Sequence, residues 1–281
     1  MLMQTTLISS IFTNSYNKSI NYKEVIYLET MLDVQKVEKY YGNKGGNVTK
    51  ALDSLSFQVS KGEFISIMGA SGSGKTTLLN CISTIDSTSA GNIYLDGADI
   101  TQLRDEELAK FRRENLGFIF QEFNLLDTLT IGENISLSLT INGLSPKEVD
   151  DRITDISAKM GIAYILNKFP YQVSGGEKQR CACARAVVTS PKMILADEPT
   201  GSLDSISSQR LLEIMVNLNQ TLNSTILMVT HDAFSASYAN RILFLKDGKI
   251  FNEIIKGEKN RQTFYYEILD VLSLLGGTTL C

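Results

Sequence analysis

The sequence predicts an α/β fold that carries an inserted helical subdomain. Short apolar runs of strand type alternate with helical segments on both sides of the insert. One of these runs leads into a glycine-rich loop that opens a helix. Between residues 122 and 190 the apolar residues follow helical spacing, and no convincing strand interrupts them.

The N-terminal half is expected to supply several strands. Residues 32–40 and 53–60 show mixed alternation of polar and apolar side chains, which indicates edge strands, and a loop at 42–46 separates them. A strand at 64–68 and a helix ending near Ile85 flank the glycine-rich loop. The next elements are a strand at 92–95 closed by Asp96 and Gly97, a helix at 105–113 and a strand at 117–120.

Helical segments fill the insert, and alternation returns after it. The insert carries helical spacing over residues 125–141, 146–160 and 175–188. After it come a strand at 193–196, a helix at 205–219, a strand at 225–229, strands at 242–246 and 249–254, and a helix at 261–275.

Two features characterise the C-terminal part. Asp247 and Gly248 predict a two-residue hairpin turn between the last two strands. The last helix is expected to pack on the domain through apolar residues at helical spacing, which are Phe264, Ile268, Leu269 and Leu272.

The glycine-rich loop is the most informative segment. Residues 69–76 match the pattern G-x-x-x-x-G-K-[ST], between an apolar strand at 64–68 and a helical run at 77–82. The alternative is an ordinary turn rich in glycine and serine. The strand before the loop and the helix after it favour a phosphate-binding loop.

Each residue type in this loop suits a phosphate ligand. Gly72 and Gly74 let the backbone curl so that N–H groups point at phosphate oxygens, and the helix N-terminus adds positive charge. Lys75 can reach the β- and γ-phosphates, while the Thr76 hydroxyl can hold Mg²⁺. The candidate nucleotide-binding residues here are Gly69, Ser71, Gly72, Ser73, Gly74, Lys75, Thr76 and Thr77.

Two acids follow the strand at 193–196. Asp197 is expected beside the phosphate loop, where it can hold Mg²⁺ through water. Glu198 can orient and deprotonate an attacking water. The alternative is that the two acids merely open a helix, but the apolar strand before them and Pro199 after them argue against it.

A second anion site is expected at the start of the helix at 175–188. Ser174, Gly175 and Gly176 precede the helical run and leave N–H groups free for an anion. Ser174 with Glu177 also forms a capping-box pattern. Both interpretations can hold, because the cap forms the helix end that meets phosphate.

Residues 174–179 resemble the signature of ABC-transporter ATPases, and the motifs of residues 32–270 follow the order of that family. The resemblance implies a P-loop NTPase core of RecA-like type, an antiparallel β subdomain and an inserted helical subdomain at about 122–190. It also implies an ATPase that takes ATP and Mg²⁺.

The resemblance assigns further site residues. Gln121 is similar to the glutamine that senses Mg²⁺ and the membrane partner, and residues 202–204, with Asp204, to the loop at the dimer interface. His231 is similar to the switch histidine that contacts the γ-phosphate. Tyr41 is similar to the aromatic residue that stacks on adenine, although Tyr40 leaves the register open. The implied catalytic residues are Glu198, His231 and Gln121, and the implied metal ligands are Thr76, Gln121 and Asp197.

The family also implies partners. Each ATP lies between the phosphate loop of one copy and the signature of a second, so the active form is a homodimer. An integral membrane permease is the other partner, which places the chain at the cytoplasmic face of the cell membrane. No stretch of the chain has eighteen apolar residues without charge, so any span must come from another chain.

Some segments resemble particular branches of the family. Residues 120–126 with 133–134 resemble the macrolide and lipoprotein exporters. Residues 126–130, 236–238 and 261–264 resemble more closely the ATPases of bacitracin and antimicrobial-peptide resistance. Macrolide or lipoprotein export is the alternative, and a soluble ABC ATPase without a transport role is a more distant one.

Composition adds further limits. The 281 residues carry a net charge of −4, whereas a nucleic-acid binder usually has a basic surplus, so no nucleic-acid partner is expected. The four cysteines are too scattered for a disulfide framework. Cys181 and Cys183 point to different faces of one helix, so we expect buried thiols there and not a shared metal.

Three segments are expected along the chain. Residues 1–30 form an N-terminal extension that is expected to be disordered, and Met31 is an alternative start. The extension lacks the features of a signal peptide. Residues 31–256 form the ATPase domain, and residues 257–281 form a helical tail.

Overall fold

The computed structural model describes residues 29–42 and 48–275, and the fold is built on two sheets. Three expectations concern segments outside these residues. They are the disorder of the N-terminal extension, the loop at 43–46 and the end of the tail. Thr30 belongs to the first strand and pairs with Ser60, so this strand begins one residue before the expected domain boundary at 31.

The larger sheet has six strands in the order β10-β9-β3-β8-β7-β6. All neighbours in it are parallel except β10, which runs antiparallel to β9. β3 and β8 are buried along their whole length, which explains their continuous apolar sequences. The strands are β3 (Phe64–Met68), β6 (Leu116–Phe120), β7 (Met193–Asp197), β8 (Thr225–Thr230), β9 (Arg241–Lys246) and β10 (Lys249–Ile255).

The smaller sheet is antiparallel, with the order β2-β1-β4-β5. The prediction that both long N-terminal strands are edge strands is wrong for β1, which lies between β2 and β4. Its register shifts between Val34 and Val37, where Lys36 has a φ of 47°. This bulge interrupts the alternation along the strand, and alternation by itself does not show how many neighbours a strand has. The bounds are β1 (Thr30–Tyr41), β2 (Thr49–Ser60), β4 (Ala90–Leu95) and β5 (Ala98–Asp99).

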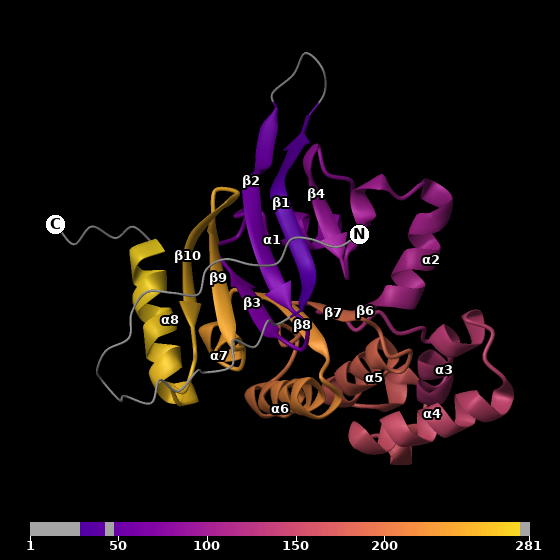
Figure 1. The fold of residues 1–281 in the computed structure, drawn as a ribbon. Helices are drawn as coiled ribbons and strands as arrows, with labels where there is room; N and C mark the ends of the chain where they lie inside the picture. The colour runs from indigo at the N-terminus through magenta and orange to yellow at the C-terminus, as the bar shows by residue number, and fades with distance from the viewer. Residues whose placement is uncertain (1–28, 43–47, 276–281) are drawn as a thin grey trace, which may run out of the picture.

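Helix α1 (Lys75–Ile82) follows the phosphate loop and lies between the two sheets (Figure 1). Its side chains Leu78 and Ile82 are fully buried among residues of both sheets. The helix ends three residues earlier than expected, because Thr84 adopts a φ of 58° and turns the chain away. α1 therefore joins the phosphate loop to the whole core.

The expected helical insert is present beside one end of the larger sheet (Figure 1). Residues 125–130, however, are not helical. Thr130 forms a capping box with Glu133, and the Asn134 side chain bonds the backbone of residues 126, 129 and 130, so the helix begins only at Ile131. The helices of this region are α3 (Ile131–Ile141), α4 (Pro146–Lys159) and α5 (Gly175–Val187), with α2 (Asp105–Asn115) before it and α6 (Ser205–Leu222) after it.

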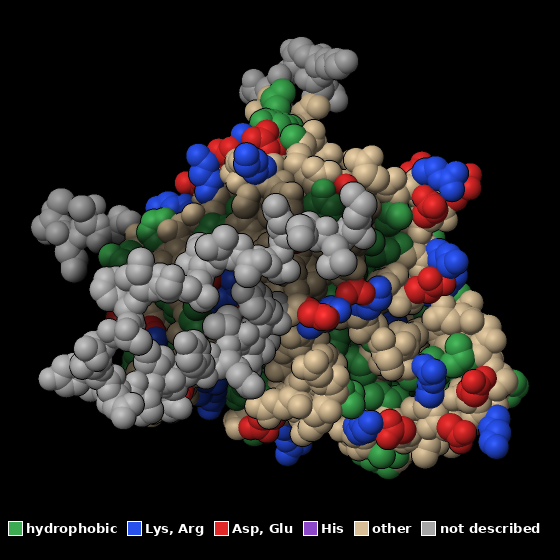
Figure 2. Space-filling view, in the orientation of Figure 1, with side chains coloured by type: hydrophobic (Ala, Val, Ile, Leu, Met, Phe, Trp, Pro, Cys, Tyr) green, Lys and Arg blue, Asp and Glu red, His purple; other side chains and the backbone are tan. Residues whose placement is uncertain are grey.

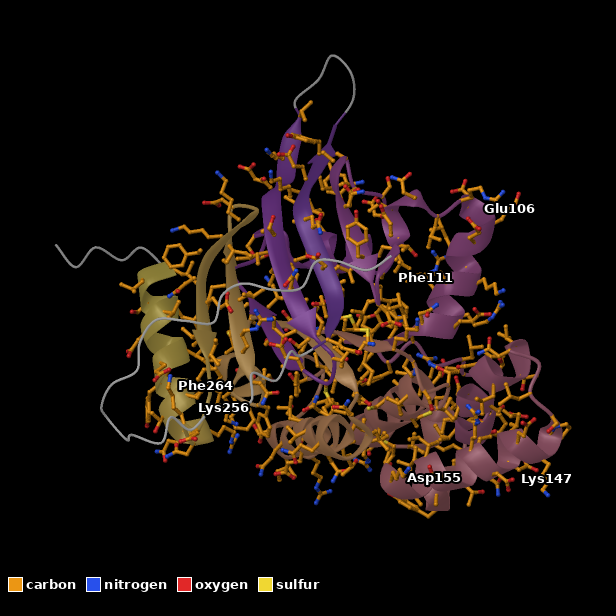
Figure 3. The ribbon with its side chains drawn as sticks, in the orientation of Figure 1. Glu106, Phe111, Lys147, Asp155, Lys256 and Phe264 are labelled. Atoms are coloured by element: carbon orange, nitrogen blue, oxygen red, sulfur yellow. The ribbon has the colours of Figure 1, made fainter. Side chains whose placement is uncertain are left out.

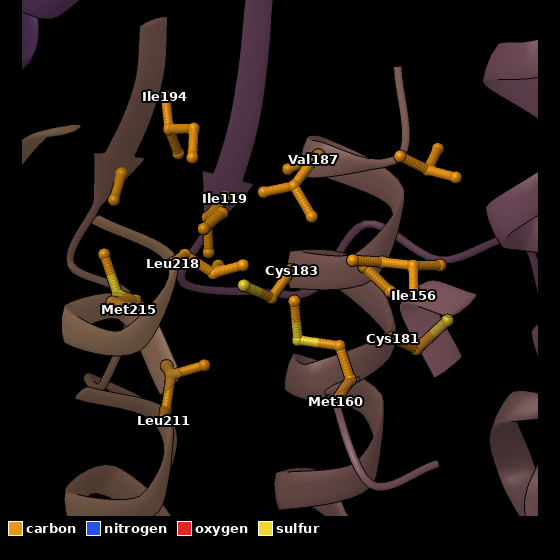
Figure 4. Packing of buried hydrophobic residues seen from close by; sticks show 14 of the residues in the cluster. Ile119, Ile156, Met160, Cys181, Cys183, Val187, Ile194, Leu211, Met215 and Leu218 are labelled. Atoms are coloured by element: carbon orange, nitrogen blue, oxygen red, sulfur yellow. The ribbon is translucent and has the colours of Figure 1, made fainter. Parts of the chain in front are cut away.

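The two thiols of α5 lie in the core between α5, α3 and α6. Figure 4 shows Cys183 pointing toward Leu218 and Cys181 pointing to the other side of the helix. Burial raises the pKa of both thiols to about 12. The expectation of buried thiols is confirmed.

At the C-terminal end, Asp247 and Gly248 both adopt positive φ and close the expected β9–β10 hairpin. A short helix, α7 (Ala233–Ala236), was not expected because a single turn leaves no periodic pattern. Helix α8 (Arg261–Leu275) packs through fully buried Phe264 and Ile268 (Figure 3). Leu269 differs from the expectation, since it is 37% exposed.

The surface carries mixed charge. Figure 2 shows acidic and basic side chains interspersed over α2 and the helical insert. Within the described part of the chain, no helix combines the length and apolar character needed to cross a bilayer.

We expect Phe264→Ala to lower the free energy of unfolding by roughly 3–5 kcal/mol, because it leaves a cavity beside β3 and β9. At this chain length each kcal/mol corresponds to roughly 2–4 °C, so thermal unfolding should show the change clearly. Tyr266→Ala on the exposed face of α8 is the control and should leave the melting temperature nearly unchanged. Equal melting temperatures for the two variants would contradict the packing of α8.

Candidate active site

The phosphate loop lines a cavity of about 600 Å³ at the carboxyl ends of the parallel strands. Most of the predicted site residues meet there. From the loop come Ser71, Gly72, Gly74, Lys75, Thr76 and Thr77, and from other segments come Gln121, Glu198 and His231. These residues lie up to 160 positions apart in the sequence, since Ser71 and His231 both line the cavity.

Glycine is required in the loop because neighbouring atoms lie too close for a Cβ or because the backbone adopts a positive φ. Gly74 has a φ of 103°, and a Cβ there would lie 2.6 Å from the Ala51 carbonyl oxygen. A Cβ on Gly69 would lie 2.4 Å from the Leu245 oxygen. Gly69 and Ser73 are absent from the cavity lining, so they shape the loop from behind.

Lys75 lies at the floor of the cavity. Its side chain is almost wholly buried, and its Nζ donates to the carbonyl oxygens of Gly69 at 2.8 Å and Ala70 at 2.9 Å. Burial lowers the pKa of Lys75, whereas Glu198 and Asp197 act in the opposite direction. A cation held only by two carbonyl oxygens remains available to phosphate oxygens.

Glu198 and His231 also line the cavity. His231 Nδ1 lies 2.8 Å from Glu198 Oε1, and the Thr230 hydroxyl donates to Glu198 Oε2 at 3.0 Å. Glu198 has a φ of 46°, a conformation that is strained for a glutamate and costs on the order of 1–3 kcal/mol. Strain of this kind is concentrated at functional sites.

A hydrogen-bonded ring fixes this pair, and no motif in the sequence indicated it. The Thr230 hydroxyl accepts from the Asp232 N–H at 3.0 Å. The Asp232 carboxylate caps α7 and accepts from the Ser235 hydroxyl at 2.6 Å. Because Ser235 thereby uses its only hydroxyl proton, the buried Thr200 hydroxyl must donate to Ser235, at 2.9 Å. Thr200 follows Glu198 by two residues, which closes the ring.

The candidate metal ligands offer only oxygen atoms. They are the Thr76 hydroxyl, the Gln121 amide and the Asp197 carboxylate, whose pKa is raised by burial and by Glu198. The described residues contain no group of three or more His, Cys, Asp or Glu side chains able to hold a metal alone. This donor set fits Mg²⁺, which binds through one or two protein oxygens together with phosphates and water.

The segment from Gln121 to Asn124 is held by α5. The buried Gln179 amide donates to the carbonyl oxygens of Phe120 at 3.1 Å and Pro199 at 2.7 Å. Arg185 donates to the Phe123 oxygen at 2.9 Å and also to that of Asn124. One helix thus connects the Gln121 loop to the Glu198 turn, a role that nothing in the sequence indicated.

Eight predicted residues, Asp197 among them, do not line the cavity, and four of the eight lie at two helix starts. Ser174, Gly175 and Gly176 lie at the start of α5, where Ser174 and Glu177 form the expected capping box. Asp204 caps α6 by accepting from the N–H groups of residues 206 and 207. The two helix starts are close together, since a Cβ on Gly176 would lie 2.7 Å from the Ser207 hydroxyl.

The charge at the start of α5 is fixed as well. The Tyr164 hydroxyl donates to Glu177, and this bond with the Ser174 contacts lowers the pKa of Glu177 to about 2. Glu177 is therefore a carboxylate at neutral pH, and it occupies the cap and leaves the exposed Gly175 free.

Tyr41 also lies outside the cavity lining. Its hydroxyl donates to Asp86 at 2.8 Å, and its ring is 42% exposed. Burial raises the pKa of Tyr41, with the Asp86 contact second, while Thr77 acts against both. Tyr40 instead bonds Glu38, so the residue on the phosphate-loop side is Tyr41.

Comparison with known proteins agrees with this geometry. Residues 52–201 match the family described as ABC transporter. The chain is 53% identical to the ABC transporter ATP-binding protein YxdL of Bacillus subtilis, over 89% of the chain and 96% of that protein. It is 49% identical to the bacitracin export ATP-binding protein BceA of Halalkalibacterium halodurans, over 88% and 97%.

A solved relative is the ATP-binding cassette MJ0796 of Methanocaldococcus jannaschii, in a dimeric post-hydrolysis state bound to ADP and phosphate. It is 38% identical, covers 80% of this chain and 98% of its own, and superposes with a TM-score of 0.73. The P-loop NTPase fold is therefore that of this family, and the chain belongs to the ABC transporter ATPases.

Proposed function

We propose that this chain hydrolyses ATP as a homodimer and drives a membrane permease for peptide antibiotics of the bacitracin type. The observation that carries the ATPase step is the contact between Glu198 and His231 in the cavity that Lys75 also lines. The phosphate loop supplies the free energy of ATP binding, and the Glu198 carboxylate lies where water attacks the γ-phosphate.

Nucleotide binding uses the loop and the residues around it. Its N–H groups and Lys75 bind the phosphates, and Tyr41 stacks on the base. Thr76, Gln121 and Asp197 hold Mg²⁺, which neutralises charge on the β- and γ-phosphates when it is bound. Lys75 exchanges its two carbonyl contacts for phosphate oxygens, which are stronger partners for a cation.

Hydrolysis is phosphoryl transfer to water. The Glu198 carboxylate accepts a proton from the attacking water, the water oxygen bonds to the γ-phosphorus, and the bond to the ADP oxygen breaks. His231 orients Glu198 and contacts the γ-phosphate. The hydrogen-bonded ring keeps both side chains in place while this happens.

The distance between the two anion sites supports the homodimer. In one chain, the cavity is not lined by Ser174, Gly175, Gly176 or Asp204. In a head-to-tail dimer, the start of α5 from one copy covers the phosphate loop of the other. ATP then closes the dimer, and loss of the γ-phosphate opens it.

The permease is expected to dock in a groove of about 490 Å³ between α2, β6, α3 and α5. Exposed Ile85 and Ile141 line it, together with Arg112, Arg113 and Arg185. An amphipathic helical segment with acidic side chains fits this lining. Arg185 belongs both to the groove and to the contacts that hold the Gln121 loop. Docking there would place the chain at the cytoplasmic face of the membrane.

The substrate class rests on the relatives. BceA is named for bacitracin export and is 49% identical to this chain. Macrolide export is the second candidate, because the macrolide export protein MacB of Aggregatibacter actinomycetemcomitans is 38% identical over 80% of the chain.

Glu198→Gln is expected to bind ATP and to lower turnover by roughly 10²–10⁴-fold, because the amide cannot accept the proton of water. ATP should then hold a stable dimer that size-exclusion chromatography detects. Glu106→Gln, on the exposed side of α2, is the matched control and should keep normal turnover (Figure 3). Normal turnover in Glu198→Gln would remove this residue from the catalytic role.

Lys75→Ala should act one step earlier and weaken ATP binding, since it removes the cation at the floor of the cavity. Titration with fluorescent ATP measures this directly. Lys110→Ala on α2 removes a charge far from the site and should bind as the natural chain does. Unchanged affinity in Lys75→Ala would contradict the phosphate-loop assignment.

Deletion of the gene is expected to sensitise its bacterium to bacitracin or lantibiotics. A susceptibility panel that includes macrolides distinguishes the two substrate candidates. The natural gene should restore resistance, and the Glu198→Gln gene should not. Altered macrolide tolerance with unchanged peptide sensitivity would favour the second candidate and leave the ATPase assignment intact.

A further inference from the structure

Helix α8 packs directly behind the catalytic cavity. Its buried side chains Phe264 and Ile268 lie in one cluster with Met68 and Ala233. Met68 is the last residue of β3 and immediately precedes the phosphate loop. Ala233 opens α7, two residues after His231. The C-terminal helix therefore contacts the supports of both walls of the cavity.

Arg261 makes the most specific contact between α8 and the segment that follows His231. Its guanidinium carbon lies 4.4 Å from the centre of the Tyr238 ring and 5.1 Å from that of Phe234. The two rings meet edge to face, with centres 5.5 Å apart. One planar cation thus packs against an aromatic pair on α7 and the residues after it.

The position of Arg261 is electrically unfavourable for α8 itself. It is the first residue of the helix, where the helix dipole disfavours a cation. Lys256 is close enough that the charge of Arg261 contributes, after burial, to lowering the pKa of Lys256. The helix dipole and the charge of Lys256 both disfavour a cation at this position. The contact of Arg261 with the two rings explains why it is nevertheless placed there.

The aromatic pair belongs to the same short segment as the catalytic ring. Phe234 N–H donates to Asp232 at 3.1 Å, and Ser235, between the two aromatic residues, bonds both Asp232 and Thr200. Asp232 bonds Thr230, which in turn bonds Glu198. A displacement of α7 would therefore move the groups that orient Glu198 and His231.

We propose that Arg261 is a positioning residue for ATP hydrolysis, which holds α7 so that His231 and Glu198 keep their contact. This proposal rests on the roles proposed above for those two residues. It gives the C-terminal helix a part in catalysis beyond packing. Arg261 is not part of the lining of the phosphate-loop cavity, so its loss should affect turnover and not ATP binding.

The test compares Arg261→Ala, His231→Ala and the double variant in the full-length chain. Arg261→Ala should lower kcat by roughly 10-fold to 10²-fold, as small displacements of catalytic groups do, with little change in KM for ATP. The double variant should be no slower than His231→Ala alone, because both changes remove the same step. Arg261→Lys, which keeps the cation without the planar fork, should recover part of the loss.

Lys259→Ala is the matched control. It removes a cation two residues before Arg261 that pairs with Glu267 on α8 and donates to the Ile255 carbonyl oxygen at 3.2 Å, so kcat should stay normal. A normal kcat in Arg261→Ala, or effects of Arg261→Ala and His231→Ala that simply multiply, would overturn the positioning role while leaving the proposed function standing. A normal kcat in His231→Ala would overturn the proposed role of His231 and the positioning role with it.

Discussion

The register of three neighbouring parallel strands is the constraint on which the site depends. Met68 of β3 stands opposite Thr230 of β8, and Asp197 of β7 stands opposite Val229. The phosphate loop, the Glu198 turn and the His231 turn therefore leave the sheet at the same edge. A slip of one residue in β7 or β8 would turn buried side chains to the other face and separate the catalytic pair from Lys75.

The charges at this edge are costly to bury, and the surrounding structure offsets the cost. The Lys75 ammonium donates to two carbonyl oxygens, and burial lowers its pKa while the carboxylates of Glu198 and Asp197 act in the opposite direction. Glu198 is held at positive φ by a bond from its N–H to the Val229 oxygen and by the ring through Thr200 and Ser235. Apolar clusters on both faces of the sheet supply the stability that such strain requires.

Helix α5 combines functions that the sequence presents as separate motifs. Its first turn is the proposed second anion site, its Gln179 joins the Gln121 loop to the Glu198 turn, and its Arg185 lines the groove proposed for the permease. A rigid helix that touches all three places gives a direct mechanical path between a docked partner and the site of hydrolysis. The core contacts of Cys181 and Cys183 hold this helix against α3 and α6.

The sequence by itself determined the phosphate loop, the acid pair, the signature segment and the order of nearly all strands and helices, because these depend on local patterns of glycine, charge and apolar spacing. It misplaced the start of α3, where the Asn134 side chain competes for the backbone, and the neighbours of β1, where a bulge interrupts alternation. Only the tertiary structure decided that Thr200, Thr230 and Ser235 surround the catalytic pair and that Arg261 reaches α7. Those contacts form between residues that only strand order and helix packing bring together. No local pattern in the chain encodes which distant residues will meet.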